Sequence, residues 1–68
     1  MNLRFVAVEN DITCIFNGDE LILVAYRTKK RNKWAFYQPI AWGLQWQSSI
    51  VITSTLEEYV TKLLREVR

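Results

Sequence analysis

The chain has 68 residues, of which 50% are hydrophobic and 24% are charged, and its formal net charge is +2 at pH 7. This length gives one small domain spanning residues 1–68, and the composition is too apolar for a disordered chain. Histidine is absent and Cys14 is the only cysteine, which excludes an intrachain disulfide and a thiolate metal cluster and removes the most common general base.

The N-terminal segment predicts neither a secretion signal nor a membrane anchor. Its apolar run ends at residues 9–11, before it reaches the length of a signal-peptide core. Elsewhere no window approaches the ~20 apolar residues that a membrane span requires. A small domain held together without disulfides fits a reducing compartment, so we expect a soluble cytoplasmic protein with no membrane partner.

The first three predicted strands cover residues 3–8, 12–16 and 21–26. The first two are short runs of apolar and β-branched residues, separated by a polar turn at residues 9–11. The third is apolar on both of its faces, which is typical of a central strand that is covered on both sides.

The dipeptide Asn17-Gly18 predicts a tight hairpin between the second and third strands. Both central positions of a type I′ turn need a positive φ, which asparagine and glycine adopt readily. With these two residues at the tip, we expect Cys14 to face Leu21.

The second half of the sheet is harder to assign. A fourth strand is predicted over residues 34–38, and Pro39 either ends it or confines its end to an edge. Residues 40–48 are left open between strand and loop, because large residues alternate there while Gly43 suggests a bulge and residues 45–49 have the composition of a loop. A last short strand is predicted over residues 49–53.

The C-terminal segment predicts an amphipathic helix. Ser54 or Thr55 is expected to be the N-cap, since each is followed three residues later by a glutamate. Apolar residues then recur at the spacing of one helical face, and they are Leu56, Tyr59, Val60, Leu63, Leu64 and Val67. The predicted fold class is α+β: a four- to five-stranded antiparallel meander sheet followed by one C-terminal amphipathic helix packed on one face.

One helix covers one face of such a sheet, and the other face keeps apolar residues whichever face the helix takes. Exposed apolar patches of this kind usually mark contact surfaces. We therefore predict a protein-interaction or regulatory module in which a second copy of the chain, or a protein partner, buries this face. The alternative is that residues 40–49 fold back and cover it. The predicted interface residues are Trp42, Trp46, Ile22, Val24 and Tyr26.

A second hypothesis is nucleic-acid binding through a basic hairpin tip. Residues 27–33 hold five basic residues in seven, which could follow phosphates while neighbouring aromatic rings stack on bases. The plain alternative is a solvated tip whose charges protect a sheet edge. The candidate contact residues are Arg27, Lys29, Lys30, Arg31, Lys33, Trp34 and Tyr37.

The sequence predicts no enzyme activity. Glu57 and Glu58 are explained by helix capping, and adjacent carboxylates on a strand point to opposite faces instead of sharing a pocket. Ser48 and Ser49 have no histidine partner, and the two glycines do not form a phosphate-binding loop. We therefore expect no catalytic residues, no cofactor, no metal and no small-molecule substrate.

The order of the predicted elements resembles that of two groups of DNA-binding proteins. From Leu21 to Val67, three strands and a helix are similar in order to the integrase arm-type DNA-binding domains. The whole chain is similar in order to the strand-rich, helix-ended coactivators that bind single-stranded DNA. Both resemblances concern the order of elements alone and assign no role to any residue.

Overall fold

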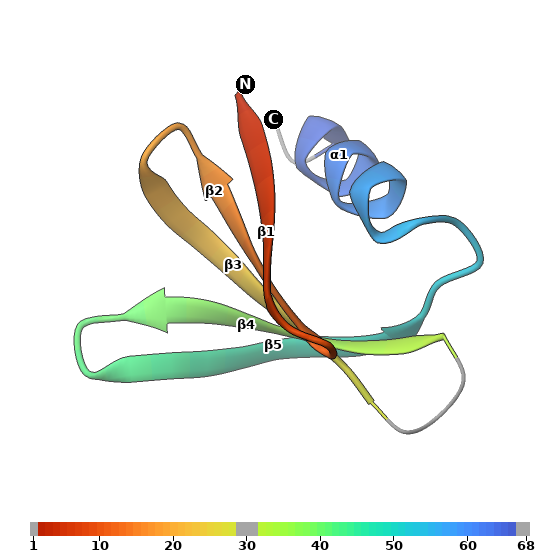
Figure 1. Cartoon of the computed structure of the whole chain (residues 1–68), viewed down its shortest axis with the longest axis horizontal. Helices are drawn as coiled ribbons and strands as arrows, with labels where there is room; N and C mark the ends of the chain where they lie inside the picture. Colours follow the sequence, from red (N-terminus) through yellow and green to blue (C-terminus); the bar gives the residue numbers. More distant parts are fainter. Residues whose placement is uncertain (1, 29–31, 67–68) are drawn as a thin grey trace.

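A computed structural model of the chain describes residues 2–28 and 32–66. The predicted antiparallel sheet followed by a C-terminal helix is confirmed, and the sheet has five strands (Figure 1). The elements are β1 (Leu3–Glu9), β2 (Ile12–Asn17), β3 (Glu20–Arg27), β4 (Lys33–Ile40), β5 (Gly43–Val51) and α1 (Leu56–Glu66).

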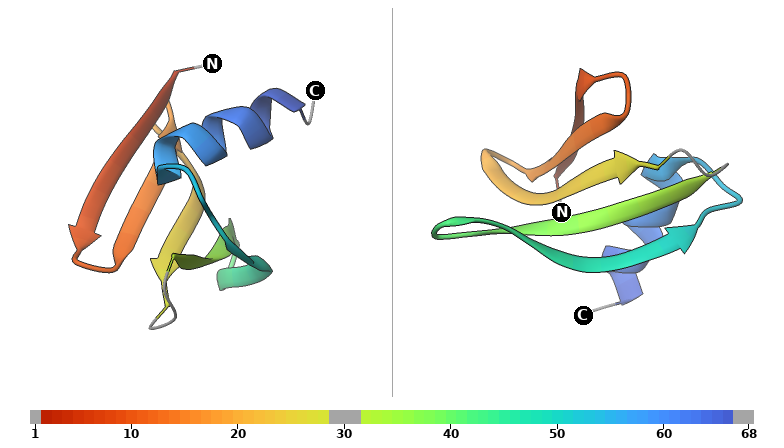
Figure 2. Two further views of the ribbon diagram at one scale, coloured as in Figure 1. Left: turned by 90° about the vertical axis from the view of Figure 1, so that its right-hand side faces the viewer. Right: turned by 90° about the horizontal axis from the view of Figure 1, so that it is seen from below.

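Each strand pairs antiparallel with the next one along the chain, and the strand order is β1-β2-β3-β4-β5. β1 and β5 are therefore the two edges of the sheet. The sheet is strongly curved, and α1 lies in the angle between the three N-terminal strands and the β4–β5 hairpin (Figures 1 and 2).

The predicted register of the β2–β3 hairpin is wrong by a few residues. Asn17 pairs with Glu20, so the loop consists of Gly18 and Asp19 instead of Asn17 and Gly18. Of the two loop residues only Gly18 has a positive φ, at 63°, which is the requirement of a type II′ turn. A bulge at Ile22 then moves the register by one more residue, and Cys14 faces Val24 instead of Leu21.

The interpretation of residues 45–49 as a loop is also wrong. β4 continues through Pro39 to Ile40, and after the two-residue turn Ala41-Trp42 the chain returns as the nine-residue strand β5. Pro39 is tolerated because the pairing of β4 with β3 ends at Tyr37, so β4 has only one neighbouring strand at the proline. The bulge in β5 lies at Gln47 and not at Gly43. The end of the β4–β5 hairpin thus projects beyond β3 (Figure 1).

The core brings together side chains from three strands, the segment after β5 and the helix. Its buried members are Ile15, Ala25, Phe36, Ile52, Leu56 and Val60. Tyr59 of α1 stacks on Phe36 of β4, with ring centroids 5.7 Å apart. The helix contributes to this core because its apolar residues recur on one side.

The helix begins after Thr55, one of the two predicted N-caps. The Glu58 N–H donates to the Thr55 side-chain oxygen at 3.2 Å, and the Tyr59 N–H donates to the Thr55 carbonyl at 3.0 Å. The first bond satisfies an amide of the first turn that has no partner within the helix, and the second is the first i→i−4 bond of the helix. In the part of the chain that the structure describes, no helix has the length and apolar character needed to cross a membrane.

Candidate interaction surface

The pairing register places one residue from each strand in a row that crosses the whole sheet. Val6 faces Cys14, Cys14 faces Val24, Val24 faces Tyr37, and Tyr37 faces Trp46. Residues directly opposite each other in antiparallel strands have their side chains on the same face. These five residues therefore share one face of the sheet.

This row lies on the face opposite to the core. Neighbours along a strand point to opposite faces, and four of the row's members are each preceded or followed by a core residue. Those neighbours are Ile15, Ala25 and Phe36 of the core cluster, and Phe5, which packs against it. We call the face that carries the row, away from the core cluster, the second face. Every member of the row is apolar or aromatic.

The centre of the second face is sheltered by its own side chains. Val24 faces Tyr37 and Ala35 faces Tyr26, and the two tyrosine rings pack edge to face at a centroid distance of 5.2 Å. As a result Val24 is only 5% exposed and Ala35 only 8% exposed, although neither belongs to the main core cluster. The accessible apolar surface of the second face therefore lies outside its centre.

Among the described residues, four of the five exposed large hydrophobic side chains lie on β5 and its turn, and the fifth, Val8, lies on β1. Trp42 is 86% exposed, Leu44 44%, Trp46 57% and Val51 64%. Leu44, Trp46 and Val51 lie on the second face, since their partners on β4 are Pro39, Tyr37 and Lys33. Trp42 lies in the turn itself. We call these four residues the β5 patch.

The indole of Trp46 is held in place along its own strand. Its Nε1–H donates to the Ser49 hydroxyl at 2.9 Å, three residues further along β5. The polar group of the ring is thereby satisfied, and the rest of the ring stays accessible. A large ring that is fixed and apolar is the kind of side chain that dominates many protein interfaces.

The predicted interface residues are only partly brought together. Val24, Tyr26 and Trp46 share the second face, with Val24 buried, Tyr26 half-buried and Trp46 exposed. Trp42 is exposed at the hairpin turn, whereas Ile22 is the additional residue of the β3 bulge and packs against the core cluster. Sequence reasoning missed Leu44 and Val51. The alternation of large residues from Ile40 to Trp46 was the signal that could have found Leu44.

The residues predicted to contact nucleic acid are also divided. Lys29, Lys30 and Arg31 lie outside the described residues. Arg27 pairs with Asp11, its Nε lying 3.1 Å from the carboxylate, and its guanidinium lies 5.9 Å from the centre of the Trp34 ring. Trp34 packs against the core cluster, and Tyr37 is on the second face. The two rings therefore do not form one stacking platform. Lys33 is half-buried at the start of β4.

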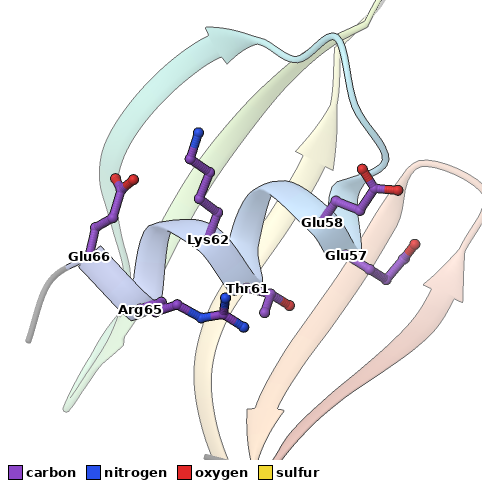
Figure 3. A pocket seen from close by; sticks show the side chains of 6 residues that line it. All are labelled: Glu57, Glu58, Thr61, Lys62, Arg65 and Glu66. Atoms are coloured by element: carbon purple, nitrogen blue, oxygen red, sulfur yellow. The ribbon is translucent and has the colours of Figure 1, made fainter.

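The outward side of α1 carries an open depression of about 620 Å³. Figure 3 shows its lining along the side of the helix that is turned away from the strands. The lining residues are Glu57, Glu58, Thr61, Lys62, Arg65 and Glu66. This mixed-charge surface is what a solvated helix face presents. Within residues 2–28 and 32–66, no three histidine, cysteine, aspartate or glutamate side chains gather closely enough to hold a metal ion.

Comparisons with protein-family models, with curated proteins and with solved structures each find no match for this chain. The function is therefore inferred from the chain's own residues and their arrangement.

Proposed function

We propose that the chain is a non-enzymatic protein-interaction domain that associates with itself through apolar surface on the second face. The observation that carries this proposal is the β5 patch, in which four large hydrophobic side chains are exposed on one strand and its turn. Large exposed apolar side chains that gather on one element often mark a contact surface.

The architecture explains why the patch remains uncovered. In this proposal the helix packs on one face of a five-stranded meander and leaves the second face to be covered by a partner. The tyrosine pair shelters the centre of that face, whereas Trp42 stays 86% exposed and Trp46 57% exposed. Burying an exposed tryptophan removes ~150–250 Å² of mostly apolar surface from water. That gain is available only through contact with another molecule.

Nucleic-acid binding by residues 27–33 is a second candidate function. The Thr28 N–H donates to the Lys33 carbonyl at 2.8 Å, so the two described ends of this segment meet where β3 ends and β4 begins. The arrangement around it favours this candidate less than the first. Arg27 is already paired with Asp11, and Trp34 packs against the core cluster instead of standing free beside the basic residues.

Sedimentation at micromolar concentration tests the first proposal. We expect the wild-type chain to form a dimer and a Trp42→Ser/Leu44→Ser variant to be monomeric and folded, because neither side chain contributes to the core. A matched control is Thr61→Ser on the outward side of the helix, which should leave association unchanged. A wild-type monomer that binds no hydrophobic dye would contradict the proposal.

A salt titration separates the two candidate functions. Apolar association should change little between low and moderate salt, whereas binding to phosphates should weaken steeply. Binding of a single-stranded oligonucleotide that falls with salt and disappears in a Lys29→Ser/Lys30→Ser/Arg31→Ser variant would favour the second candidate.

A further inference from the structure

We propose that two copies of the chain join along β5, which pairs antiparallel with β5 of the second copy about a two-fold axis. The two five-stranded sheets then continue as one. This inference rests on the proposed self-association and names the element that carries it.

β5 is an edge strand with an accessible free side. It pairs with β4 alone, and no other described residues pair along its opposite side. With nine residues it is the longest strand of the sheet, about 30 Å at ~3.3 Å per residue. Its first five residues, 43–47, are all exposed. Its unpaired backbone amides and carbonyls offer a template for another strand.

β5 has a bulge at Gln47, but it lacks the charges by which sheet edges are normally kept from pairing. The chain has nine basic and seven acidic residues, yet none of them lies between Trp34 and Leu56. The other edge strand, β1, carries Arg4 and Glu9 and is bulged at Val8. Charges and bulges are common means of preventing edge-to-edge association. β1 is therefore protected by charge, and β5 is not.

The absence of charge favours a second copy over a foreign strand. In a two-fold pair the same strand meets itself, so any charged residue near the axis would approach a like charge. β5 carries no charge and meets no such repulsion. Complementary charge is one means by which a foreign partner is selected, and β5 offers none for that purpose.

Apolar side chains beside the joint add to the backbone pairing. Trp42, Leu44 and Trp46 lie on β5 or its turn, next to the free edge. Edge pairing leaves the second face open, so the two β5 patches contact each other only across the joint, and we expect a contact of less than about 1,200 Å², the range of weak or transient interfaces. The bond from Trp46 to Ser49 fixes the indole before association and so reduces the side-chain entropy lost on binding.

The proposed assembly closes at two copies. Pairing through β5 uses both uncharged edges and leaves a β1 strand at each end of the joined sheet. Arg4, Glu9 and the bulge at Val8 then protect those ends. An isologous contact of this kind forms a closed dimer and not an open fibre.

Two lysine substitutions distinguish edge pairing from packing of the second faces. Gln45 is the third residue of β5 and is exposed, and its side chain lies on the face opposite to Trp46. Gln45→Lys therefore places a charge at the edge without altering the second face. Val6 lies in the row on β1, so Val6→Lys places the same charge on the second face, far from β5 along the strand order.

Sedimentation of both variants, with circular dichroism to establish that each is folded, gives the test. We expect Gln45→Lys to weaken dimerisation by at least about tenfold, because each copy brings a lysine to the pairing edge, and Val6→Lys to leave it unchanged. A dimer that is lost in Val6→Lys and kept in Gln45→Lys overturns the β5 pairing and leaves the proposed self-association standing. A wild-type chain that stays monomeric overturns both.

Amide hydrogen exchange on the wild-type chain tests the same pairing without any substitution. Raising the concentration from the monomeric to the dimeric range should slow exchange of β5 amides that face the free edge, because they gain hydrogen bonds. Amides of β1 should exchange at the same rate in both ranges. A dimer whose β5 amides exchange as fast as those of the monomer overturns the proposed pairing.

Discussion

Tyr26 of β3 and Tyr37 of β4 pack edge to face on the second face, with an angle of 77° between their ring planes. Tyr26 faces Ala35 and Tyr37 faces Val24, so the four side chains form a block in which each ring stands opposite a smaller residue. This block gives the second face a small core of its own. It explains why the accessible apolar surface is found on β5 instead of at the centre of the sheet.

The tyrosine pair should show a measurable coupling in a double-mutant cycle. Tyr26→Ala, Tyr37→Ala and the double variant remove one ring, the other and both, and the coupling expected for an aromatic pair is ~0.5–1.5 kcal/mol. Urea denaturation at fixed protein concentration measures the free energies, since self-association stabilises the folded chain. Strictly additive effects would show that the two rings do not support each other.

Ile15 of β2 should be among the most sensitive positions in the core, because it is completely buried within the core cluster. Ile15→Ala is expected to lower the free energy of unfolding by ~2–5 kcal/mol, and Ile15→Val by ~0.5–1.5 kcal/mol. A domain of this size has a total stability of roughly 3–10 kcal/mol. The alanine variant should therefore be largely unfolded in mild denaturant, while the valine variant remains folded.

Thermal and urea denaturation of the two variants check this prediction. Thr61→Ala, on the exposed side of α1, is the control and should stay close to wild type. An Ile15→Ala variant as stable as wild type would show that the described core does not hold the sheet and helix together.

The order of strands and helix could be predicted because it depends on local patterns. The apolar runs of the first half and the helical spacing from Leu56 onward are each specified by neighbouring residues, as is the Thr55 cap. β5 was partly misread because glutamine and serine are common in loops. They are tolerated there because β5 is an edge strand with much of its surface in water.

The register could not be predicted because bulges depend on tertiary packing. Residues Val8, Ile22 and Gln47 each interrupt the pairing by one position, and nothing in their local sequence requires it. Each shift changes which residues face one another across two strands. The row from Val6 to Trp46, and therefore the composition of the second face, follows only once these three positions are known.

The N-cap of the helix should contribute a measurable part of the stability. The Thr55 hydroxyl oxygen accepts the Glu58 N–H at 3.2 Å, so Thr55→Ala leaves this amide without its partner. The expected loss is ~1 kcal/mol, within the range of ~0.5–2 kcal/mol found for such caps. Ser54→Ala is the matched control, because the Ser54 hydroxyl donates to the Thr55 carbonyl and not to an amide of the first turn. Equal losses of stability in both variants would show that Ser54, the other predicted N-cap, also caps the helix.

The ion pair between Arg27 and Asp11 should contribute little to stability. Its atoms lie 3.1 Å apart, but the two side chains are 50% and 62% exposed, so water and salt screen the attraction. Asp11→Asn is expected to cost ~0.2–1 kcal/mol at low salt, and the difference from wild type should shrink as salt is added. The backbone pairing at this end of the β2–β3 hairpin should persist. The Arg27 N–H donates to the Asp11 backbone carbonyl at 2.8 Å, and the substitution leaves that bond in place. Urea denaturation at low and high salt measures both effects. A loss of several kcal/mol that does not respond to salt would mean that the Asp11 carboxylate holds the hairpin ends together by more than this exposed pair.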